Sequence, residues 1–290
     1  MPSLAKIAIR ELKNGPKRTA AVATVQNFLP ATFGPDDFAA SQAGFQNLQD
    51  LYKILQQDFD DNEQRLNNSD SPLHRREFTR AAFAMIEGIL YGMKAAVVSR
   101  TTALPPGLFS QAELDCLTET SIRIENGKPT PVPCHPKFAE NVVIALNAYL
   151  KNAGSGLIIR PGGAPWQRFC NTIKTRDRVT HPKTPASLVI TDDERAQVHD
   201  AAYWFGQTLG KAMHEAARAT ATTMAIHLPR FQEDARRLGR ALDADPTNAE
   251  LRDQHAALTR NCADIAAALA DMENIGGDGQ RTGQPPGATL

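Results

Sequence analysis

Residues 71–100 restrict the fold of this chain more than any other segment, because their apolar residues recur at helical spacing throughout. Ser71 is a favourable N-cap residue, and Pro72 suits the first position of a helix. The apolar residues form a single stripe, which consists of Ala82, Met85, Ile86, Ile89, Leu90, Met93 and Val97. The segment therefore predicts a long amphipathic helix that contributes one face to a hydrophobic core.

Charged residues accompany the stripe on another face of the same predicted helix. Glu87 lies seven residues from both Arg80 and Lys94, so these three side chains share that face. Because Glu87 and Lys94 interrupt the apolar run, the segment does not have the pattern of a membrane span. We interpret the charged residues first as the solvated edge of a core helix.

The rest of the chain is also mainly helical in its pattern. Apolar residues recur at helical spacing in residues 38–59, 138–150 and 191–213, and another helix is expected to begin near Ala164. The segment 191–213 opens with a Thr-x-x-Glu capping box. Residues 121–132 differ: two short strand-like runs flank Asn-Gly, the preferred pair for a tight hairpin turn. We therefore predict an all-α fold with one small inserted β-hairpin.

The last part of the chain is rich in alanine and charge. Asp245-Pro246 is a natural helix start, and four apolar residues recur every seven positions after it, namely Leu251, Leu258, Ile265 and Met272. Too few heptads are present for a stable coiled coil, so we predict a helical hairpin within the chain. This hairpin could instead dock a partner protein, or cover an active groove until a trigger arrives.

Four regions follow from these patterns. Residues 1–70 form an N-terminal helical extension that includes a short basic helix at about residues 4–13, and residues 71–218 form the main helical domain. Residues 219–275 form the C-terminal helical hairpin, and the glycine-rich residues 276–290 are expected to be disordered.

Composition excludes several classes of function. Lys plus Arg and Asp plus Glu are both 32, so the formal net charge is zero and any nucleic-acid surface must come from local clustering. The four cysteines include no CxxC pair, and the seven histidines include no HExxH motif. No glycine-rich phosphate loop is present, so we expect neither a metal nor a cofactor. The N-terminus lacks the apolar run of a secretory signal, and we expect a soluble cytoplasmic protein.

One local basic cluster stands out in this neutral chain. Residues 160–183 contain one acidic residue, Asp177, and six basic residues, which are Arg160, Arg168, Lys174, Arg176, Arg178 and Lys183. Four residues separate Arg176 from His181, a spacing of roughly 7.5 Å along a helix axis. The cluster predicts an RNA-binding surface to which Arg178, Lys183, Lys174 and Arg168 contribute.

An arginine beside a histidine suits phosphodiester cleavage without a metal. Histidine titrates near neutral pH, so it can remove a proton from a ribose 2′-hydroxyl or protonate the leaving 5′-oxygen. A guanidinium can hold the nonbridging oxygens while negative charge grows on the phosphoryl group. One chain offers one such histidine, whereas the reaction needs an acid and a base. A two-fold dimer would supply both.

This segment resembles the HEPN superfamily, whose ribonucleases carry an R-x4–6-H motif. Arg176 and His181 match that motif, and Asp177 is the polar residue that often follows the arginine. Other features match in order: the helix RREFTRAAFAMIEGILYGMK (75–94), the Asn-Gly hairpin, Trp166, the HPK after Thr180, and AAYWF at 201–205. The resemblance covers roughly residues 71–218.

The resemblance implies a helical bundle that forms a homodimer through the motif helix and cleaves RNA, such as tRNA or another structured RNA. It implies that Arg176 and His181 are catalytic and that Asp177 orients one of them. It also implies a toxin–antitoxin or anti-phage defence setting, with an antitoxin or defence protein as a possible partner. From the helix face, we expect Glu87 or Arg80 to support the motif. The chain departs from the best-known toxin subgroup, because Lys183 replaces a tyrosine two residues after the histidine.

An alternative interpretation is a noncatalytic HEPN-type module that binds RNA or a nucleotide and dimerises. In that case His181 simply caps the end of its helix, where a cation meets the negative end of the dipole. Arg176 would then be a structural partner of Glu87. Trp166 is expected in the core, although it could also stack on a base.

Overall fold

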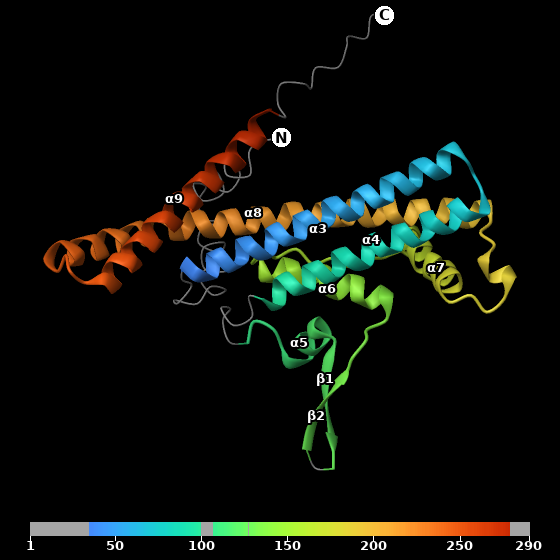
Figure 1. Cartoon of the computed structure of the whole chain (residues 1–290), viewed down its shortest axis with the longest axis horizontal. Coiled ribbons are helices and arrows are strands. Elements are labelled where there is room, and N and C mark those ends of the chain that lie inside the picture. The colour runs from blue at the N-terminus through green and yellow to red at the C-terminus, as the bar shows by residue number, and fades with distance from the viewer. Residues whose placement is uncertain (1–34, 100–106, 127, 279–290) are drawn as a thin grey trace, which may run out of the picture. The chain divides into compact units, whose positions relative to one another are not determined.

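The structure is a computed structural model that describes residues 35–99, 107–126 and 128–278. In these residues it contains seven helices and one two-stranded sheet, so the prediction of an all-α fold with a small β-hairpin is confirmed. Figure 1 shows the order of these elements along the chain. The predicted basic helix near residues 4–13 and most of the predicted disordered tail, from residue 279 onward, lie outside the described residues.

The described chain divides into two compact units. The first unit comprises residues 40–152 and 156–215, and the second contains residues 35–39, which begin α3, together with residues 153–155 and 216–278. The first unit thus includes residues 40–70, which were predicted to form an N-terminal extension. Its elements are α3 (Pro35–Asn68), α4 (Pro72–Val98), α5 (Gln111–Thr118), β1 (Thr120–Glu125), β2 (Lys128–Pro133), α6 (Phe138–Asn152), α7 (Gly163–Thr180), the 3-10 turn η1 (Pro185–Leu188) and the start of α8 (Asp192–Ala244).

Helix α4 is the centre of the first unit. The Ser71 hydroxyl accepts a hydrogen bond from the backbone N–H of His74 at 3.2 Å, as the predicted N-cap requires. The apolar stripe is buried, and α4 packs against α5, α6 and α7. By length and composition α4 alone among the described helices could cross a membrane, and 56% of its most apolar window is buried inside the protein. That burial is typical of the core helix of a soluble protein.

Close packing joins α3 to α4. A Cβ added at Gly92 would lie 2.9 Å from Cδ1 of Leu48, and Leu48 is itself buried. The ring of Phe59 on α3 lies 5.4 Å from that of Phe78 on α4. Because these contacts bury apolar side chains of α3, residues 40–68 belong to the same core as α4.

A buried lysine connects three segments of the first unit. Lys94 of α4 is 3% exposed, pairs with the carboxylate of Glu119, and donates to Oδ1 of Asn141 at 3.0 Å. The Lys94 ammonium is the main cause that holds the pKa of Glu119 below its usual value. The pair places Glu119, in a left-handed conformation at the end of α5, next to the core.

The hairpin follows directly. Strands β1 and β2 are antiparallel, Ser121 pairs with Val132, and Asn126 in the turn has φ of 54°. This confirms the predicted strand–turn–strand segment. Pro129, Pro131 and Pro133 alternate along β2, so its edge lacks backbone donors at these positions.

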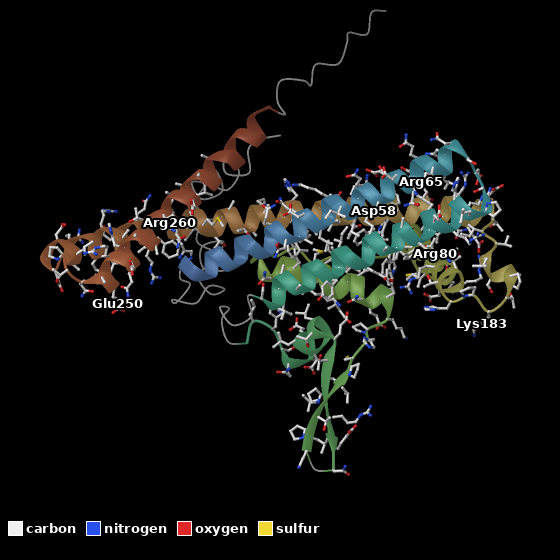
Figure 2. The ribbon with its side chains drawn as sticks, in the orientation of Figure 1. Asp58, Arg65, Arg80, Lys183, Glu250 and Arg260 are labelled. Atoms are coloured by element: carbon white, nitrogen blue, oxygen red, sulfur yellow. The ribbon has the colours of Figure 1, made fainter. Side chains whose placement is uncertain are left out.

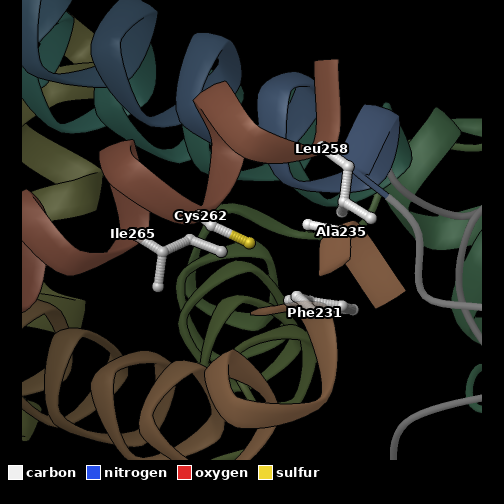
Figure 3. Packing of buried hydrophobic residues seen from close by; sticks show 5 residues of the cluster. All are labelled: Phe231, Ala235, Leu258, Cys262 and Ile265. Carbon is white, nitrogen blue, oxygen red and sulfur yellow. The ribbon is translucent and has the colours of Figure 1, made fainter. Parts of the chain in front are cut away.

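The second unit contains the predicted C-terminal helical hairpin. Helix α8 continues to Ala244 through Pro229, and α9 (Ala249–Asp278) follows the turn at Asp245. Figure 3 shows the apolar contact between the two helices, which is formed by Phe231, Ala235, Leu258, Cys262 and Ile265. Two members of the predicted seven-residue repeat, Leu258 and Ile265, are therefore buried at this contact.

Candidate functional site

Helix α7 carries the predicted motif. It begins at Gly163 and ends at Thr180, before Pro182. Phe169, Thr172, Thr175 and Val179 recur at helical spacing and are buried, so this face packs against the core. Arg176 lies beside that face with 23% of its side chain exposed.

The guanidinium of Arg176 has three neighbours within the first unit. Its Nη2 pairs with the carboxylate of Glu87 on α4, and its Nη1 donates to Oδ1 of Asp177 at 2.8 Å. Its Cζ lies 5.5 Å from the centre of the Phe138 ring, within the range of a cation–π interaction. The structure thus brings Arg176, Asp177 and Glu87 together. The contact with Phe138 has no local signal in the sequence.

Arg80 of α4 contacts the C-terminal end of α7. Its Nη2 donates to the backbone carbonyl of Val179 at 3.2 Å. The last carbonyls of a helix lack partners within the helix, and a cation there also opposes the helix dipole. Figure 2 labels Arg80 on α4 near α7. Both residues expected to face the motif, Glu87 and Arg80, therefore contact α7.

His181 forms the C-cap of α7. Its backbone N–H donates to the carbonyl of Asp177 at 2.9 Å, and its φ and ψ of −123° and 62° lie outside the helical region. The side chain is exposed to solvent. No hydrogen bond joins it to Arg176 or to another residue in the part of the chain that the structure describes.

Arg178 is occupied by contacts within the chain. Its Nη1 donates to the carbonyls of Ser187 at 3.0 Å and Val189 at 2.6 Å, and its Nη2 donates to Oε1 of Glu194 at 2.6 Å. Partial burial alone would raise the pKa of Glu194, but hydrogen bonds from the Thr191 backbone and from Arg178 outweigh it and lower that pKa. Arg178 thus holds the turn between α7 and α8 in place. It was predicted to bind RNA, and these contacts within the chain occupy its guanidinium.

The other predicted RNA-binding residues are more accessible. Lys174 on α7 and Lys183 in the following turn are exposed, and neither forms an ion pair with a described carboxylate. Figure 2 labels Lys183 in that turn. Arg168 lies near the start of α7, eight residues before Arg176, with its Nε 3.5 Å from Oδ2 of Asp200. The basic cluster is therefore spread along the helix and not gathered at its end.

Two aromatic residues near Arg168 belong to a ring cluster. Trp166 packs on Phe169 with ring centres 5.3 Å apart, and on Trp204 at 5.2 Å. Both tryptophans are half-buried. Trp166 therefore lies at the edge of the core, as expected of a tryptophan with one accessible side.

Within the described ranges, no group of three or more His, Cys, Asp or Glu side chains could hold a metal ion. No protein-family model matches the chain, and no curated protein or solved structure shows significant similarity to it.

Proposed function

We propose that the chain is a cytoplasmic, metal-independent endoribonuclease of the HEPN type, in which Arg176 and His181 of two subunits form the active site. The observation that carries the proposal is the pairing of Arg176 with Glu87 at the accessible end of α7, where His181 and Lys183 are exposed. A guanidinium that is already fixed in position loses less conformational entropy when it binds a phosphate.

The remaining donors of Arg176 suit a phosphodiester. A guanidinium has five N–H donors, and the contacts with Glu87 and Asp177 use one from Nη2 and one from Nη1. The other donors are available for the nonbridging oxygens, on which charge increases in the transition state. Glu87 therefore serves as a positioning residue, and Asp177 holds the second edge of the guanidinium.

His181 supplies proton transfer. Its imidazole takes the proton of a ribose 2′-hydroxyl, the 2′-oxygen attacks the adjacent phosphorus, and the bond to the 5′-oxygen breaks. The imidazole of the second subunit donates a proton to that leaving oxygen. The products are a 2′,3′-cyclic phosphate and a free 5′-hydroxyl. Exposed Lys174 and Lys183 hold flanking phosphates.

A toxin–antitoxin or anti-phage defence role fits such an activity, with an antitoxin or another defence protein as its regulator. Inside a cell, such an enzyme needs either a partner that inhibits it or a resting state that a trigger relieves. This part of the proposal rests on the resemblance and on the chemistry, and a tRNA or another structured RNA is the proposed substrate.

A second candidate function has an observation in its favour. Arg176 already contacts two carboxylates and the Phe138 ring, and in the described part of the chain no hydrogen bond joins it to the His181 side chain. These contacts suit a noncatalytic module that binds RNA or a nucleotide and dimerises. In that module Arg176 joins α7 to α4, and His181 caps α7.

Expression in cells distinguishes the two functions. Wild type, Arg176→Ala and His181→Ala are produced to equal levels, and growth and RNA integrity are compared. The nuclease predicts growth arrest and RNA fragments that either substitution abolishes. Purified protein should cleave in EDTA and leave a 2′,3′-cyclic phosphate end. Cleavage that persists in both variants, or that requires Mg²⁺, would contradict the proposed site.

A further inference from the structure

A groove of about 670 Å³ lies in the first unit, away from the end of α7 that carries His181. Residues 158–168 form one wall, from the segment before α7 through its first turns, and residues 200–211 of α8 form the other. All the lining residues belong to the same compact unit. The nuclease chemistry described above uses none of them as a catalytic group.

The groove is positively charged. Arg160, Arg168 and Lys211 line it, against the single carboxylate of Asp200. Asp200 lies 3.5 Å from Arg168. Arg160 and Lys211 are exposed, and neither pairs with a carboxylate in the described part of the chain. Because the whole chain is neutral, this local excess of positive charge favours an anionic ligand.

One side of the groove carries an accessible aromatic ring. Tyr203 is 64% exposed, and its hydroxyl accepts a hydrogen bond from Nε2 of Gln207 at 2.6 Å. Trp204 also lines the groove and is supported from behind by Trp166 and Phe169, whose ring centres lie 5.2 and 4.8 Å away. Tyr203, Gln207 and Lys211 are spaced four residues apart, so they follow one face of α8.

We infer that this groove binds a single-stranded segment of the RNA, with a base stacked on Tyr203 and phosphates held by Arg160 and Lys211. Aromatic rings beside a basic groove are the combination that single-stranded nucleic acids require. The choice of RNA over another anion rests on the proposed function. Arg168 and Arg176 lie about 12 Å apart along α7, a distance that a few nucleotides can span. A strand held in the groove would therefore reach the end of α7.

The chain contains its own reporter for this groove. It has only two tryptophans, Trp166 and Trp204, and both belong to the ring cluster at the groove. A base that enters the groove should change tryptophan emission. We therefore propose to titrate full-length His181→Ala protein, in which cleavage does not interfere, with a short fluorescein-labelled oligouridylate. Anisotropy gives the affinity, and tryptophan emission with the unlabelled oligonucleotide gives the location.

Matched variants in the same background test the inference. Tyr203→Ala should weaken binding about 5- to 150-fold, the range expected for loss of one base–aromatic stack. Tyr91→Ala removes a similarly exposed tyrosine from α4, at 68% exposure, and should have no effect. Arg160→Gln and Lys211→Gln should each reduce the salt dependence by about one phosphate contact. Arg123→Gln, on the hairpin, is the control for charge.

Several outcomes would overturn the inference. These are equal effects of Tyr203→Ala and Tyr91→Ala, equal affinity for a double-stranded RNA, or tighter binding of phosphatidylserine vesicles through the same lysine and arginine. The proposed function fails separately. If RNA binds through Tyr203 but no cleavage occurs in wild type, the groove stands and the nuclease does not. If wild type cleaves RNA and the groove variants cleave it equally well, the groove assignment fails and the nuclease stands.

Discussion

The guanidinium of Arg176 on α7 pairs with the carboxylate of Glu87 on α4, which precedes it by 89 residues. The contact joins two helices and also fixes the arginine that we assign to the phosphodiester. Glu87 is 42% exposed, so solvent screens the pair and its effect on stability should be small.

Substitutions at this pair should separate stability from activity. Arg176→Ala should lower the cleavage rate by about 100- to 1,000-fold, as expected for loss of a group that stabilises transition-state charge. Glu87→Gln should lower it less, and it should reduce the free energy of unfolding by no more than about 1 kcal/mol. Rates are measured on an RNA oligonucleotide, and stability by urea denaturation.

Arg75 provides the matched control, because it is also a half-buried arginine that joins segments of the first unit. It pairs with Asp70 and Asp192 and donates to the Ile190 carbonyl at 2.9 Å. Arg75→Gln should destabilise the protein and leave the rate per folded molecule unchanged. An equal loss of rate in Arg75→Gln and Arg176→Ala would show that Arg176 acts through folding alone.

His181→Ala should leave stability nearly unchanged and greatly lower the cleavage rate. The side chain is exposed and follows the last helical residue of α7, so its removal should change the free energy of unfolding by less than about 0.5 kcal/mol. Loss of a general acid or base typically costs about 100- to 10,000-fold in rate. His214→Ala, at another exposed position, is the control for loss of an imidazole. Full activity of His181→Ala would remove it from the mechanism.

Substitutions of Arg178 and Lys174 should have different effects on stability and RNA binding, although both residues belong to the basic cluster. Arg178→Met removes the donors to the Ser187 and Val189 carbonyls and to Glu194, and should destabilise the protein by about 1–3 kcal/mol. Lys174→Gln should leave stability unchanged and reduce the salt dependence of RNA binding by about one contact. Thermal denaturation and binding at several salt concentrations test both. If instead Arg178→Met reduced the salt dependence of RNA binding and left stability unchanged, Arg178 would be a residue that contacts RNA.

The pair formed by Lys94 and Glu119 should make stability depend on pH in the acid range. Its lowered pKa means that Glu119 stabilises the fold fully above about pH 4.5, its usual pKa, and that this contribution is lost as pH falls below that value. Glu119→Gln should destabilise the protein by about 1–3 kcal/mol at pH 7 and much less at low pH. Urea denaturation of the variant and wild type across pH 3–7 measures this difference.

Combining Lys94→Met with Glu119→Gln tests whether the unpaired charge of Lys94 causes this loss of stability. Lys94 is buried, so Glu119→Gln leaves its charge without a carboxylate partner. Replacing both residues removes the unpaired charge and should recover part of the lost stability. If the changes in the free energy of unfolding of the two single variants simply add in the double variant, the pairing of Lys94 with Glu119 does not explain the effect of Glu119→Gln.

Local signals predicted some elements well. Helix α4 was expected at residues 71–100 and spans Pro72–Val98, because its cap and its apolar stripe lie within the segment itself. The β-hairpin depended on Asn-Gly in the same way. Helix α5 was missed because prolines surround it, although Ser110 and Glu113 form a capping box that marks its start.

The candidate site was predicted only in part. The sharing of a helix face suggested that Glu87 or Arg80 would face the motif, and both contact α7. The partners of Arg178 could not be found in this way, since they depend on the path of the chain after Pro182. The groove beside Tyr203 also escaped notice, because segments from both sides of α7 form it.

The requirement for two subunits can be tested by mixing. If one His181 acts as base and the partner's imidazole acts as acid, a dimer with one substituted subunit should be inactive. When wild type and His181→Ala are co-expressed in equal amounts and assort randomly, about one quarter of the dimers contain two intact subunits. Activity per wild-type chain should then fall to about half, and an excess of the variant should lower it further.

The control for this mixing is His214→Ala, which should about double the activity per wild-type chain, because every dimer keeps both His181 side chains. Native mass spectrometry of the co-expressed chains gives the fraction of mixed dimers. A monomer at assay concentrations, or mixed dimers that retain half of the activity of the intact ones, would contradict a site shared between subunits. In the second case each His181 would act alone, and the proton for the leaving 5′-oxygen would have to come from another group or from water.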